Sequence, residues 1–578
     1  MTIFAGVINL KSEKIQHEQF NELKSVLTIL CPGGRIFENN RKNCQLISID
    51  LGNFDNEAIK EDAQCLTLIC GDPLIRDTVG LSRFDDTKVL HQAFKKSLQV
   101  SVLGKAKGVF SGLHFDWETN SLMIFTDKLG VRPVYLYEAN DVIVFSSLSK
   151  SITDLSFVDL EIDLRGTCEK LIFNYSMDHR TSYKQIKLLK GGHVYKISPK
   201  GTIETFCYWD WKSIPTLSNV CETTVQEVFQ AFNDAVTLRL GGNKDAVAFL
   251  SGGLDSRCLV SLLKEQTESL TTFNFSTDES QDKHLASLFA QKAGIHHIEK
   301  TLDRLSSPNW SMLMANELAK TERETPFENI KIVWSGDGGS VGMGYVYITR
   351  TIIEALSKKD HAKAISEILG SSSTLLKKIF RTKYRNDLDR LLENSVEAEM
   401  PSISDDPGKA AYHFFMNNDQ RRHLTAHFET IGQHRIEFYL PFFDSNFLQK
   451  IFAIPSHEML YHSFYMRWFE YFPASSREVA WQTYPNHRPC PLEIPANLSY
   501  QWENNEDEVS TEDRDRDFKY LFGLLSKRAK ILMYISRIKI MPAIMLYWLN
   551  IRNNSYLVEM LRRFEAIVEG QNNVASKT

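Results

Sequence analysis

The hexapeptide Ser251-Gly252-Gly253-Leu254-Asp255-Ser256 has residue types and a spacing that suit an anion-binding turn. It follows the apolar run 246–250, which is typical of a buried strand, and a helical pattern begins near Arg257. Glycines let backbone N–H groups approach an anion closely, and the start of a helix adds positive partial charge. The serine hydroxyls can donate to the same anion, and the Asp255 carboxylate can hold the Mg²⁺ that accompanies a nucleotide. We therefore predict that this turn binds nucleotide phosphates.

Two other interpretations of this turn are weaker. It is not a Walker A loop, because no Gly-Lys-Ser or Gly-Lys-Thr follows the glycines. It is also not readily explained as an ordinary glycine–serine turn, because a strand precedes it and a helix follows at once.

Length and composition indicate a cytoplasmic protein of two or three domains. The chain has 578 residues and a mass of 66.4 kDa, which is too much for one core. An apolar fraction of 43% and a charged fraction of 24% are typical of a soluble globular protein, and the net charge of -5 offers no basic footprint for nucleic acid. Nine cysteines show no metal-ligand spacing and cannot all pair, so we expect reduced core thiols. The N-terminus lacks the pattern of a signal peptide.

The pattern of apolar residues changes along the chain. Residues 1–210 are rich in short apolar segments and turns, whereas in 215–500 strands alternate with helical periods, which indicates a parallel α/β sheet. The mostly acidic run at 501–517 is expected to be a solvated linker. Residues 518–578 are expected to form an apolar, basic and helical tail.

Individual elements can be placed within these parts. Strands are expected at 3–10, 66–70, 122–126, 142–146, 192–197, 246–250, 271–275 and 332–334, and helices at 281–293 and within 355–400 and 409–430. The apolar run 531–549 has about the length of a membrane span. Because Arg537, Lys539 and Pro542 interrupt it, we expect a packed helical pair and no transmembrane segment, with an interfacial or partner-binding helix as the alternative.

Further motifs carry a resemblance to a known family. In the first part these are Phe4-Ala5-Gly6-Val7, the segments 108–112 and 127–135, and Phe145-Ser146-Ser147 with Lys150. In the second part they are the Ser251 turn, the glycine-rich turn 335–340 after the strand 332–334, and the segment 437–444. With these motifs the chain, to about residue 495, resembles the asparagine synthetase B superfamily. Its members join an N-terminal-nucleophile glutaminase domain to an ATP-dependent synthetase domain.

The resemblance implies a fold of mixed α/β and α+β class. It consists of an Ntn-hydrolase-like αββα sandwich, an ATP-pyrophosphatase (adenine nucleotide α hydrolase-like) parallel-sheet domain, and the helical tail. ATP and Mg²⁺ are the implied cofactors. The residues expected to bind the nucleotide are Phe249, Ser251, Gly252, Gly253, Asp255, Ser256, Ser335 and Gly336. Asp255 and Asp337 are the expected metal ligands, and the expected catalytic residues are Asp337, Glu437 and Arg467.

The first domain departs from the family where ammonia would be released. Working glutaminases of the family expose a cysteine directly after the initiator Met, and its thiolate attacks glutamine. This chain has Thr2 there, Cys70-Gly71-Asp72 in place of the family's Asn-Gly-Glu, and the segment 45–48 in place of its Arg-Leu-Ser turn. We therefore expect a glutaminase fold without glutaminase activity.

The second domain departs at two residues that handle charge. Relatives usually end the second turn with a metal-binding Asp, where this chain has Ser340. Either Asp337 takes over metal binding, or the metal relies on Asp255, phosphate oxygens and water. The other interpretation of Asp337 is a carboxylate that caps the turn. The lysine of the family's Lys-x-x-Leu-Arg helix aligns with Ser463, so only Arg467 matches. The candidates to replace that lysine are Arg421, Arg422 and Arg435, each with an ordinary salt bridge as the alternative.

Four other residues have weaker assignments. Glu437 either orients or deprotonates the attacking amine or forms a structural ion pair. Asp282 is expected to make a minor contact, and His296 and His297 lie in an expected strand and are not expected to bind a metal.

Without ammonia, the attacking amine must already belong to a substrate. The chain is most similar to the lasso-peptide macrolactam synthetases (lasso cyclases), which also lack the N-terminal cysteine. The resemblance implies a ligase of antibiotic biosynthesis that adenylates an Asp or Glu side chain of a ribosomal peptide, which the peptide's N-terminal amine then captures. A leader peptidase and a leader-binding protein are the implied partners. The alternatives are a small-molecule amidotransferase or β-lactam-synthetase-like enzyme, and a catalytically silent nucleotide-binding scaffold.

Overall fold

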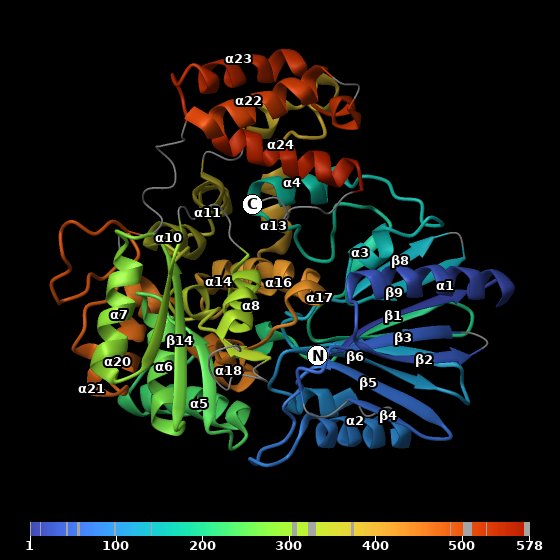
Figure 1. Cartoon of the computed structure of the whole chain (residues 1–578), viewed down its shortest axis with the longest axis horizontal. Coiled ribbons are helices and arrows are strands. Elements are labelled where there is room, and N and C mark those ends of the chain that lie inside the picture. Colours follow the sequence, from blue (N-terminus) through green and yellow to red (C-terminus); the bar gives the residue numbers. More distant parts are fainter. Residues whose placement is uncertain are drawn as a thin grey trace.

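The computed structural model describes residues 2–11, 13–41, 44–54, 58–97, 100–139, 141–302, 309–321, 331–370, 375–485, 487–500, 511–526 and 529–570. Figure 1 shows three parts: a β-sandwich, an α/β domain beside it, and a group of helices above both.

The first part is a sandwich of two six-stranded antiparallel sheets with a helix on each outer face (Figure 1). The sheet orders are β10-β8-β9-β1-β3-β2 and β12-β11-β7-β6-β5-β4. The strands are β1 (Thr2–Asn9), β2 (Arg35–Arg41), β3 (Cys44–Asp50), β4 (Ile59–Glu61), β5 (Cys65–Gly71), β6 (Phe110–Asp116), β7 (Ser121–Thr126), β8 (Tyr135–Ala139), β9 (Val142–Ser146), β10 (Ile186–Leu188), β11 (His193–Ile197) and β12 (Ile203–Cys207). Helix α1 (Glu13–Leu30) packs on the first sheet and α2 (Arg83–Ser97) on the second. This arrangement confirms the predicted αββα fold.

Burial on both faces explains why the central strands are apolar along their whole length. Every residue of β5 is buried. Its alternate residues Leu66 and Leu68 pack between the sheets, whereas Ile69 packs with Leu90 and Phe94 of α2.

The second part contains the predicted parallel sheet, which has five strands in the order β15-β14-β13-β16-β17. Its strands are β13 (Asp245–Phe249), β14 (Ser269–Ser276), β15 (His296–Thr301), β16 (Ile332–Trp334) and β17 (Glu437–Tyr439). Helices α5 (Glu222–Leu240), α6 (Leu254–Gln266) and α7 (Gln281–Ala293) lie along it (Figure 1). Because β13 and β16 are neighbours, the two glycine-rich turns leave the sheet side by side at its carboxyl edge, where α/β proteins bind ligands.

Short helices complete this part. They are α8 (Trp310–Thr321), α9 (Gly339–Gly342), α10 (Arg350–Ser357), α11 (His361–Leu369), α12 (Leu375–Ile379), α13 (Leu391–Glu399), α14 (Lys409–Phe415), α15 (Arg421–His423), α16 (Thr425–Glu429), α17 (Ile431–His434), α18 (Ser445–Ala453), α19 (Ser456–Met459), α20 (Ser463–Phe469) and α21 (Ala474–Arg477). Helix α4 (Leu164–Phe173) of the first part packs against α13.

The tail folds into α22 (Thr511–Ser526), α23 (Arg537–Trp548) and α24 (Ser555–Val568). The acidic linker expected at 501–517 is thus corrected in its second half, because residues 511–517 open α22, and 501–510 lie outside the described residues. Helix α23 packs on α22, and α24 packs on α4. Within the described part of the chain, no helix is long and apolar enough to cross a membrane.

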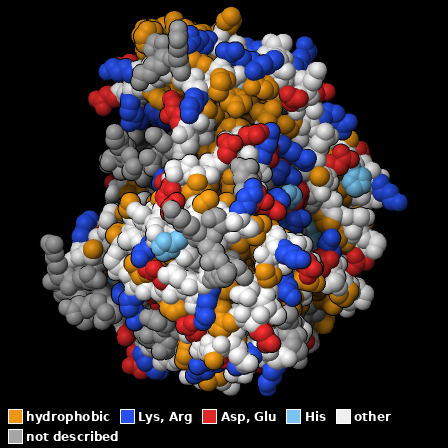
Figure 2. Space-filling model, turned by 90° about the vertical axis from the view of Figure 1, so that its right-hand side faces the viewer, with side chains coloured by type: hydrophobic (Ala, Val, Ile, Leu, Met, Phe, Trp, Pro, Cys, Tyr) orange, Lys and Arg blue, Asp and Glu red, His pale blue; other side chains and the backbone are white. Residues whose placement is uncertain are grey.

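The tail nevertheless leaves many apolar side chains exposed, and Figure 2 shows apolar groups gathered at the top of the molecule, where these helices lie. The exposed residues are Phe522, Met533, Ile538, Met541, Met545, Leu546, Trp548, Leu549, Ile551 and Tyr556.

Candidate active site

The first glycine-rich turn is braced by its own serines. The Ser251 N–H donates to Ser256 Oγ at 2.9 Å, and the two hydroxyl oxygens are 2.8 Å apart. Gly253 precedes the 13-residue helix α6, and no side chain caps that helix start. The first N–H groups and the positive end of α6 therefore lie at this turn, and no side chain of the described residues caps them.

Asp282 of α7 fixes the backbone of this turn. Its Oδ1 accepts from the Gly252 N–H at 2.8 Å, and its Oδ2 accepts from Asn274 Nδ2 at 2.8 Å. Asn274, on β14, also donates to the Leu250 carbonyl at 2.9 Å. A Cβ on Gly252 would lie 2.8 Å from Asp282 Cα, so the position requires glycine. Asp282 was expected to make only a minor contact, but it shapes the turn.

The second glycine-rich turn packs directly on the first. A Cβ on Gly336 would lie 2.7 Å from the Ser256 nitrogen, and one on Gly339 would lie 2.4 Å from Asp255 Cγ. Glycines at these positions thus allow the two turns to touch.

Asp255 lies between the turns, partly exposed. The Tyr465 hydroxyl of α20 donates to its Oδ1 at 2.8 Å, and the Ser340 N–H also donates to the carboxylate. Desolvation and the nearby charge of Asp337 outweigh these bonds and raise the pKa of Asp255 to about 7.

Asp337 is held by two other side chains. The Ser335 hydroxyl donates to Oδ2 at 2.5 Å, and His423 Nε2 lies 2.9 Å from Oδ1. Desolvation works against the carboxylate, but the bonds from His423 and Ser335 prevail and lower the pKa of Asp337. Desolvation likewise works against the imidazolium, but Asp337 prevails and raises the pKa of His423.

The donor set at the two turns fits a hard divalent cation. Asp255 and Asp337 are both partly exposed carboxylates, and the charge of Asp337 disfavours ionisation of Asp255. A cation between them would remove that repulsion, and the residues that hydrogen-bond the two carboxylates would keep them oriented. These two residues would hold Mg²⁺, which would supply positive charge to the phosphates. Ser340, in contrast, engages Tyr484 through its side chain.

Phe249 ends β13 beside the first turn. Its ring lies 5.8 Å from that of Phe438, edge to face, and 6.2 Å from that of Phe275. These rings form an apolar patch where β13 ends and the turn begins.

Glu437 does not belong to this site. It begins β17, at the amino end of the strand, and its Oε2 accepts from Arg132 Nη2 at 2.6 Å and from Nη1 at 3.1 Å. Both side chains are buried. Glu437 is thus one half of an ion pair between the two domains, which corrects its assignment as an amine-activating group.

Arg467 also points elsewhere. It donates to the Val220 carbonyl at 3.3 Å and lies 3.6 Å from Glu458. The helix that carries it contributes Tyr465 to the turns instead, because the two residues face different sides of α20.

The candidate replacement cations bind backbone carbonyls of the first domain. Arg421 and Arg422 both donate to the Asp178 carbonyl at 3.0 Å, and Arg435 donates to that of Pro32. They join the domains and are not assigned to the reaction. His297 contacts the Thr272 hydroxyl at 2.8 Å within the sheet, and neither it nor His296 belongs to a metal-ligating cluster of the described residues.

In the first domain, Thr2 is buried in β1, and its hydroxyl has no hydrogen-bond partner among the described residues. Cys70 donates from its thiol to the Thr2 carbonyl, and Asp72 is engaged by Arg76 at 2.8 and 2.9 Å. The segment 45–48, expected as a turn, lies inside strand β3.

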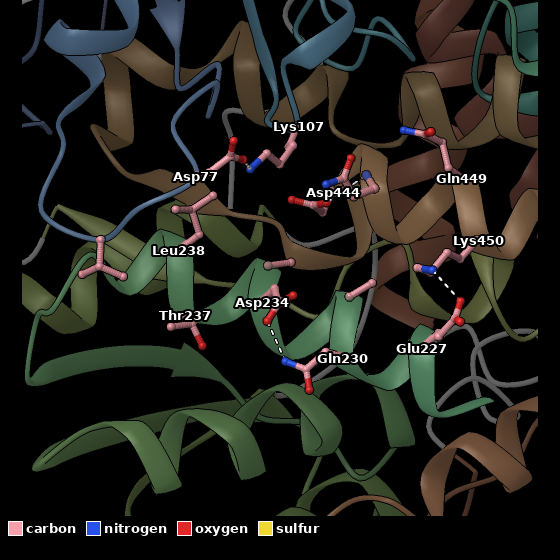
Figure 3. A pocket seen from close by; sticks show the side chains of 14 residues that line it. Asp77, Lys107, Glu227, Gln230, Asp234, Thr237, Leu238, Asp444, Gln449 and Lys450 are labelled. Atoms are coloured by element: carbon pink, nitrogen blue, oxygen red, sulfur yellow. Dashed lines mark hydrogen bonds and ion pairs between the residues drawn. The ribbon is translucent and has the colours of Figure 1, made fainter. Parts of the chain in front are cut away.

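A cavity of about 700 Å³ lies elsewhere, between α5, α18 and the first domain (Figure 3). Its charged lining is largely self-paired: Glu227 binds Lys450 at 2.9 Å, and Asp77 binds Lys107. None of its lining residues belongs to the glycine-rich turns, so we do not assign the reaction to it.

Tyr465, His423 and Asn274 complete the site but were not foreseen. His423 follows two arginines that had been singled out, and Tyr465 lies two residues before Arg467, so each was adjacent to a motif. Only the three-dimensional contacts distinguish them from their neighbours.

Comparisons with known proteins agree with this arrangement. A family model described as a glutamine amidotransferase domain matches residues 74–209, and one described as asparagine synthase matches residues 227–306. Asparagine synthetase [glutamine-hydrolyzing] 1 of Bacillus subtilis (strain 168) is 28% identical over 239 residues, which cover 41% of this chain and 36% of that protein. Asparagine synthetase [glutamine-hydrolyzing] 3 of the same organism is 26% identical over 241 residues, which cover 41% of this chain and 39% of that protein.

The chain thus spans less than two fifths of the length of these curated relatives. Residues 74–209 and 227–306 thus resemble, in this order, a glutamine amidotransferase domain and an asparagine synthase domain. These matches agree with the resemblance to the asparagine synthetase family, whereas the lasso-cyclase subtype stays a prediction.

Proposed function

We propose that this chain is an ATP-dependent amide-forming ligase that activates a carboxylate by adenylation and releases AMP and pyrophosphate. The observation that carries the proposal is the pair of glycine-rich turns packed on each other, with Asp255 and Asp337 between them. The matched asparagine synthase region contains the first turn and Asp282.

The chain's own groups have separate tasks in this reaction. The N–H groups at the start of α6 and the hydroxyls of Ser251 and Ser256 bind the departing pyrophosphate as charge moves onto it. Asp282 holds the turn rigid, so that these donors need not reorganise in the transition state. His423, paired with Asp337, fixes the orientation of that carboxylate.

The finer proposal is macrolactam formation on a ribosomal peptide, as in lasso cyclases. The activated group is an Asp or Glu side chain, and the nucleophile is the N-terminal amine of the same peptide. Its support is the buried Thr2 hydroxyl, which replaces the thiol that would release ammonia from glutamine. A substrate that carries its own amine does not need that ammonia.

The exposed apolar side chains of the tail support a partner proposal. A patch of this kind on a basic helical segment is suited to bind another protein, and a leader peptidase or leader-binding protein is our candidate. The small-molecule amidotransferase alternative keeps the same adenylation site and differs only in the substrate.

Mass spectrometry of the reaction tests the proposal. The full chain is incubated with ATP, Mg²⁺ and candidate precursor peptides, without glutamine or ammonia. Loss of one water from a peptide together with AMP release is the expected result. AMP release only with a small acid and added ammonia would contradict the macrolactam proposal and favour the amidotransferase. No AMP under either condition would favour the silent scaffold.

A further inference from the structure

A compact group of potential metal ligands lies in the first domain, between the outer face of its second sheet and helix α2. Cys65 comes from β5, His114 from the neighbouring strand β6, and His91 from α2. One ligand atom from each lies within 4.8 Å of the other two, and all three residues are buried. Asp62, in the turn between β4 and β5, lies at the edge of the group.

The separations among Cys65, His91 and Asp62 are close to those of tetrahedral zinc coordination. His91 Nε2 lies 3.7 Å from Cys65 Sγ and 3.2 Å from Asp62 Oδ2, and Cys65 Sγ lies 3.7 Å from Asp62 Oδ1. With Zn–N of about 2.0–2.1 Å and Zn–S of about 2.3 Å, neighbouring ligand atoms in a tetrahedron are about 3.3–3.6 Å apart. These three separations need to change by only a few tenths of an ångström, whereas the ligand atom of His114, within 4.8 Å of those of Cys65 and His91, must move closer by up to about 1.5 Å.

The surroundings orient the ligands for this task. Thr67 Oγ1 lies 3.1 Å from His91 Nδ1 and 2.8 Å from His114 Nδ1. A hydroxyl on Nδ1 of His91 leaves Nε2, the atom nearest Cys65, available to a metal, and ligating histidines usually have such a second partner. Thr67 lies opposite His114 in the sheet and two residues after Cys65, so one face of β5 presents both the ligand and its support.

A divalent cation bound here would take the Cys65 side chain as a thiolate, and the thiol proton would pass to solvent.

We propose that Cys65, His91 and His114 bind a structural Zn²⁺, with Asp62 as the fourth ligand. The thiolate and the carboxylate together balance the charge of the ion. Lys95 Nζ, 2.6 Å from Asp62 Oδ2, remains as an outer partner of that carboxylate. Because Cys65, His91 and His114 are buried and come from β5, α2 and β6, the ion fastens the helix to the sheet and does not serve the chemistry of the glycine-rich turns.

Metal analysis of the full chain tests this site. The protein is stripped with a chelator, dialysed and titrated with ZnCl₂ alone, and the same is done with CoCl₂. We expect one ion per chain, a higher melting temperature with Zn²⁺, and a thiolate-to-cobalt charge-transfer band with tetrahedral d–d bands for Co²⁺. No stoichiometric binding, or binding without the charge-transfer band, would overturn the proposal.

Variants separate ligation from folding. Cys65→Ser should abolish the charge-transfer band, and Thr67→Val should weaken Zn²⁺ affinity about 10–100-fold, as loss of a supporting partner usually does. Cys44→Ser, at a buried cysteine of β3, is the matched control and should bind one ion like the unmodified chain. Equal affinity in the Cys65 and Cys44 variants would contradict the site. Should Cys65→Ser fail to fold, the Thr67→Val titration and the cobalt spectrum of the unmodified chain still show whether the metal ion binds at this cluster.

Discussion

The Tyr465 hydroxyl donates a 2.8 Å hydrogen bond to Oδ1 of Asp255, linking α20 to the carboxylate that lies between the two glycine-rich turns. Tyr465 is fully buried, so the bond is shielded from solvent. It lowers the pKa of a carboxylate that desolvation and Asp337 otherwise raise.

Tyr465→Phe should therefore slow adenylation most at neutral pH. Without the hydroxyl the pKa of Asp255 rises further, and a smaller fraction is ionised to hold Mg²⁺. We expect a rate of ATP–pyrophosphate exchange about 3–10-fold lower at pH 7 and a smaller deficit at pH 9. Tyr471→Phe removes a hydroxyl that binds Glu222 instead, and is the control. A deficit that does not change with pH would contradict this role of Tyr465.

The stability of the ligand-free protein should fall as pH rises from about 4 to about 7. Asp255 has a folded-state pKa near 7 and an ordinary value of 3.8, so the folded state binds the extra proton in that window. The neutral Asp255 side chain therefore contributes its full stabilisation to the folded state below about pH 4, and this stabilisation is lost as the pH rises through about 7. At pH 8 Asp255→Asn should thus be more stable than the unmodified chain, by about 1–2 kcal/mol after allowance for partial exposure. Urea denaturation at pH 5 and pH 8 measures this, and a smaller gain at pH 8 than at pH 5 would contradict it.

Gly252 and Gly253 should respond differently to alanine. At Gly252 a Cβ would meet Asp282 Cα at 2.8 Å, whereas at Gly253 the nearest atom, Ser251 Oγ, would be 3.5 Å away. Gly252→Ala must shift the turn and should weaken ATP binding at least tenfold, because its donors lose their positions. Gly253→Ala should weaken it less than threefold. Calorimetric titration with a non-hydrolysable ATP analogue distinguishes them, and equal losses would count against the packing argument.

Breaking the ion pair between the domains should lower the free energy of unfolding and leave the ATP–pyrophosphate exchange activity unchanged. Glu437→Gln leaves the buried Arg132 guanidinium without its counter-charge, and we expect a loss of about 3–5 kcal/mol. Glu161→Gln breaks a surface pair with Lys184 and should change stability by less than about 1 kcal/mol. Denaturant curves give both values. A folded Glu437→Gln protein that retains ATP–pyrophosphate exchange but forms no amide would restore Glu437 to the reaction.

The strands and turns were predictable because local pattern determines them. The run 142–146 and the segments 281–293 and 332–334 form the expected elements residue for residue. The glycine-rich turns follow because strand, glycines and helix succeed one another within a few residues.

The placement of Glu437 and Arg467 was not predictable in this way. Glu437 belongs to a motif near the site, but it begins its strand, and only the carboxyl end of a parallel strand faces the ligand edge. Residues two positions apart lie on opposite faces of a helix. Tyr465 and Arg467 of α20 therefore cannot both reach Asp255. The cluster of Cys65, His91 and His114 shows no regular spacing, because its members meet only across a sheet and a helix.

In the proposed reaction, cleavage of ATP between its α and β phosphates at residues 251–256 powers amide formation. Exchange of labelled pyrophosphate into ATP measures this directly, with Mg²⁺ and a peptide that carries a free Asp or Glu side chain. Asp255→Ala is compared with Asp245→Ala, which changes an exposed carboxylate at the other end of β13. We expect exchange in the unmodified chain and in Asp245→Ala, and a loss of at least a hundredfold in Asp255→Ala. Undiminished exchange in Asp255→Ala, or none in the unmodified chain, would contradict it.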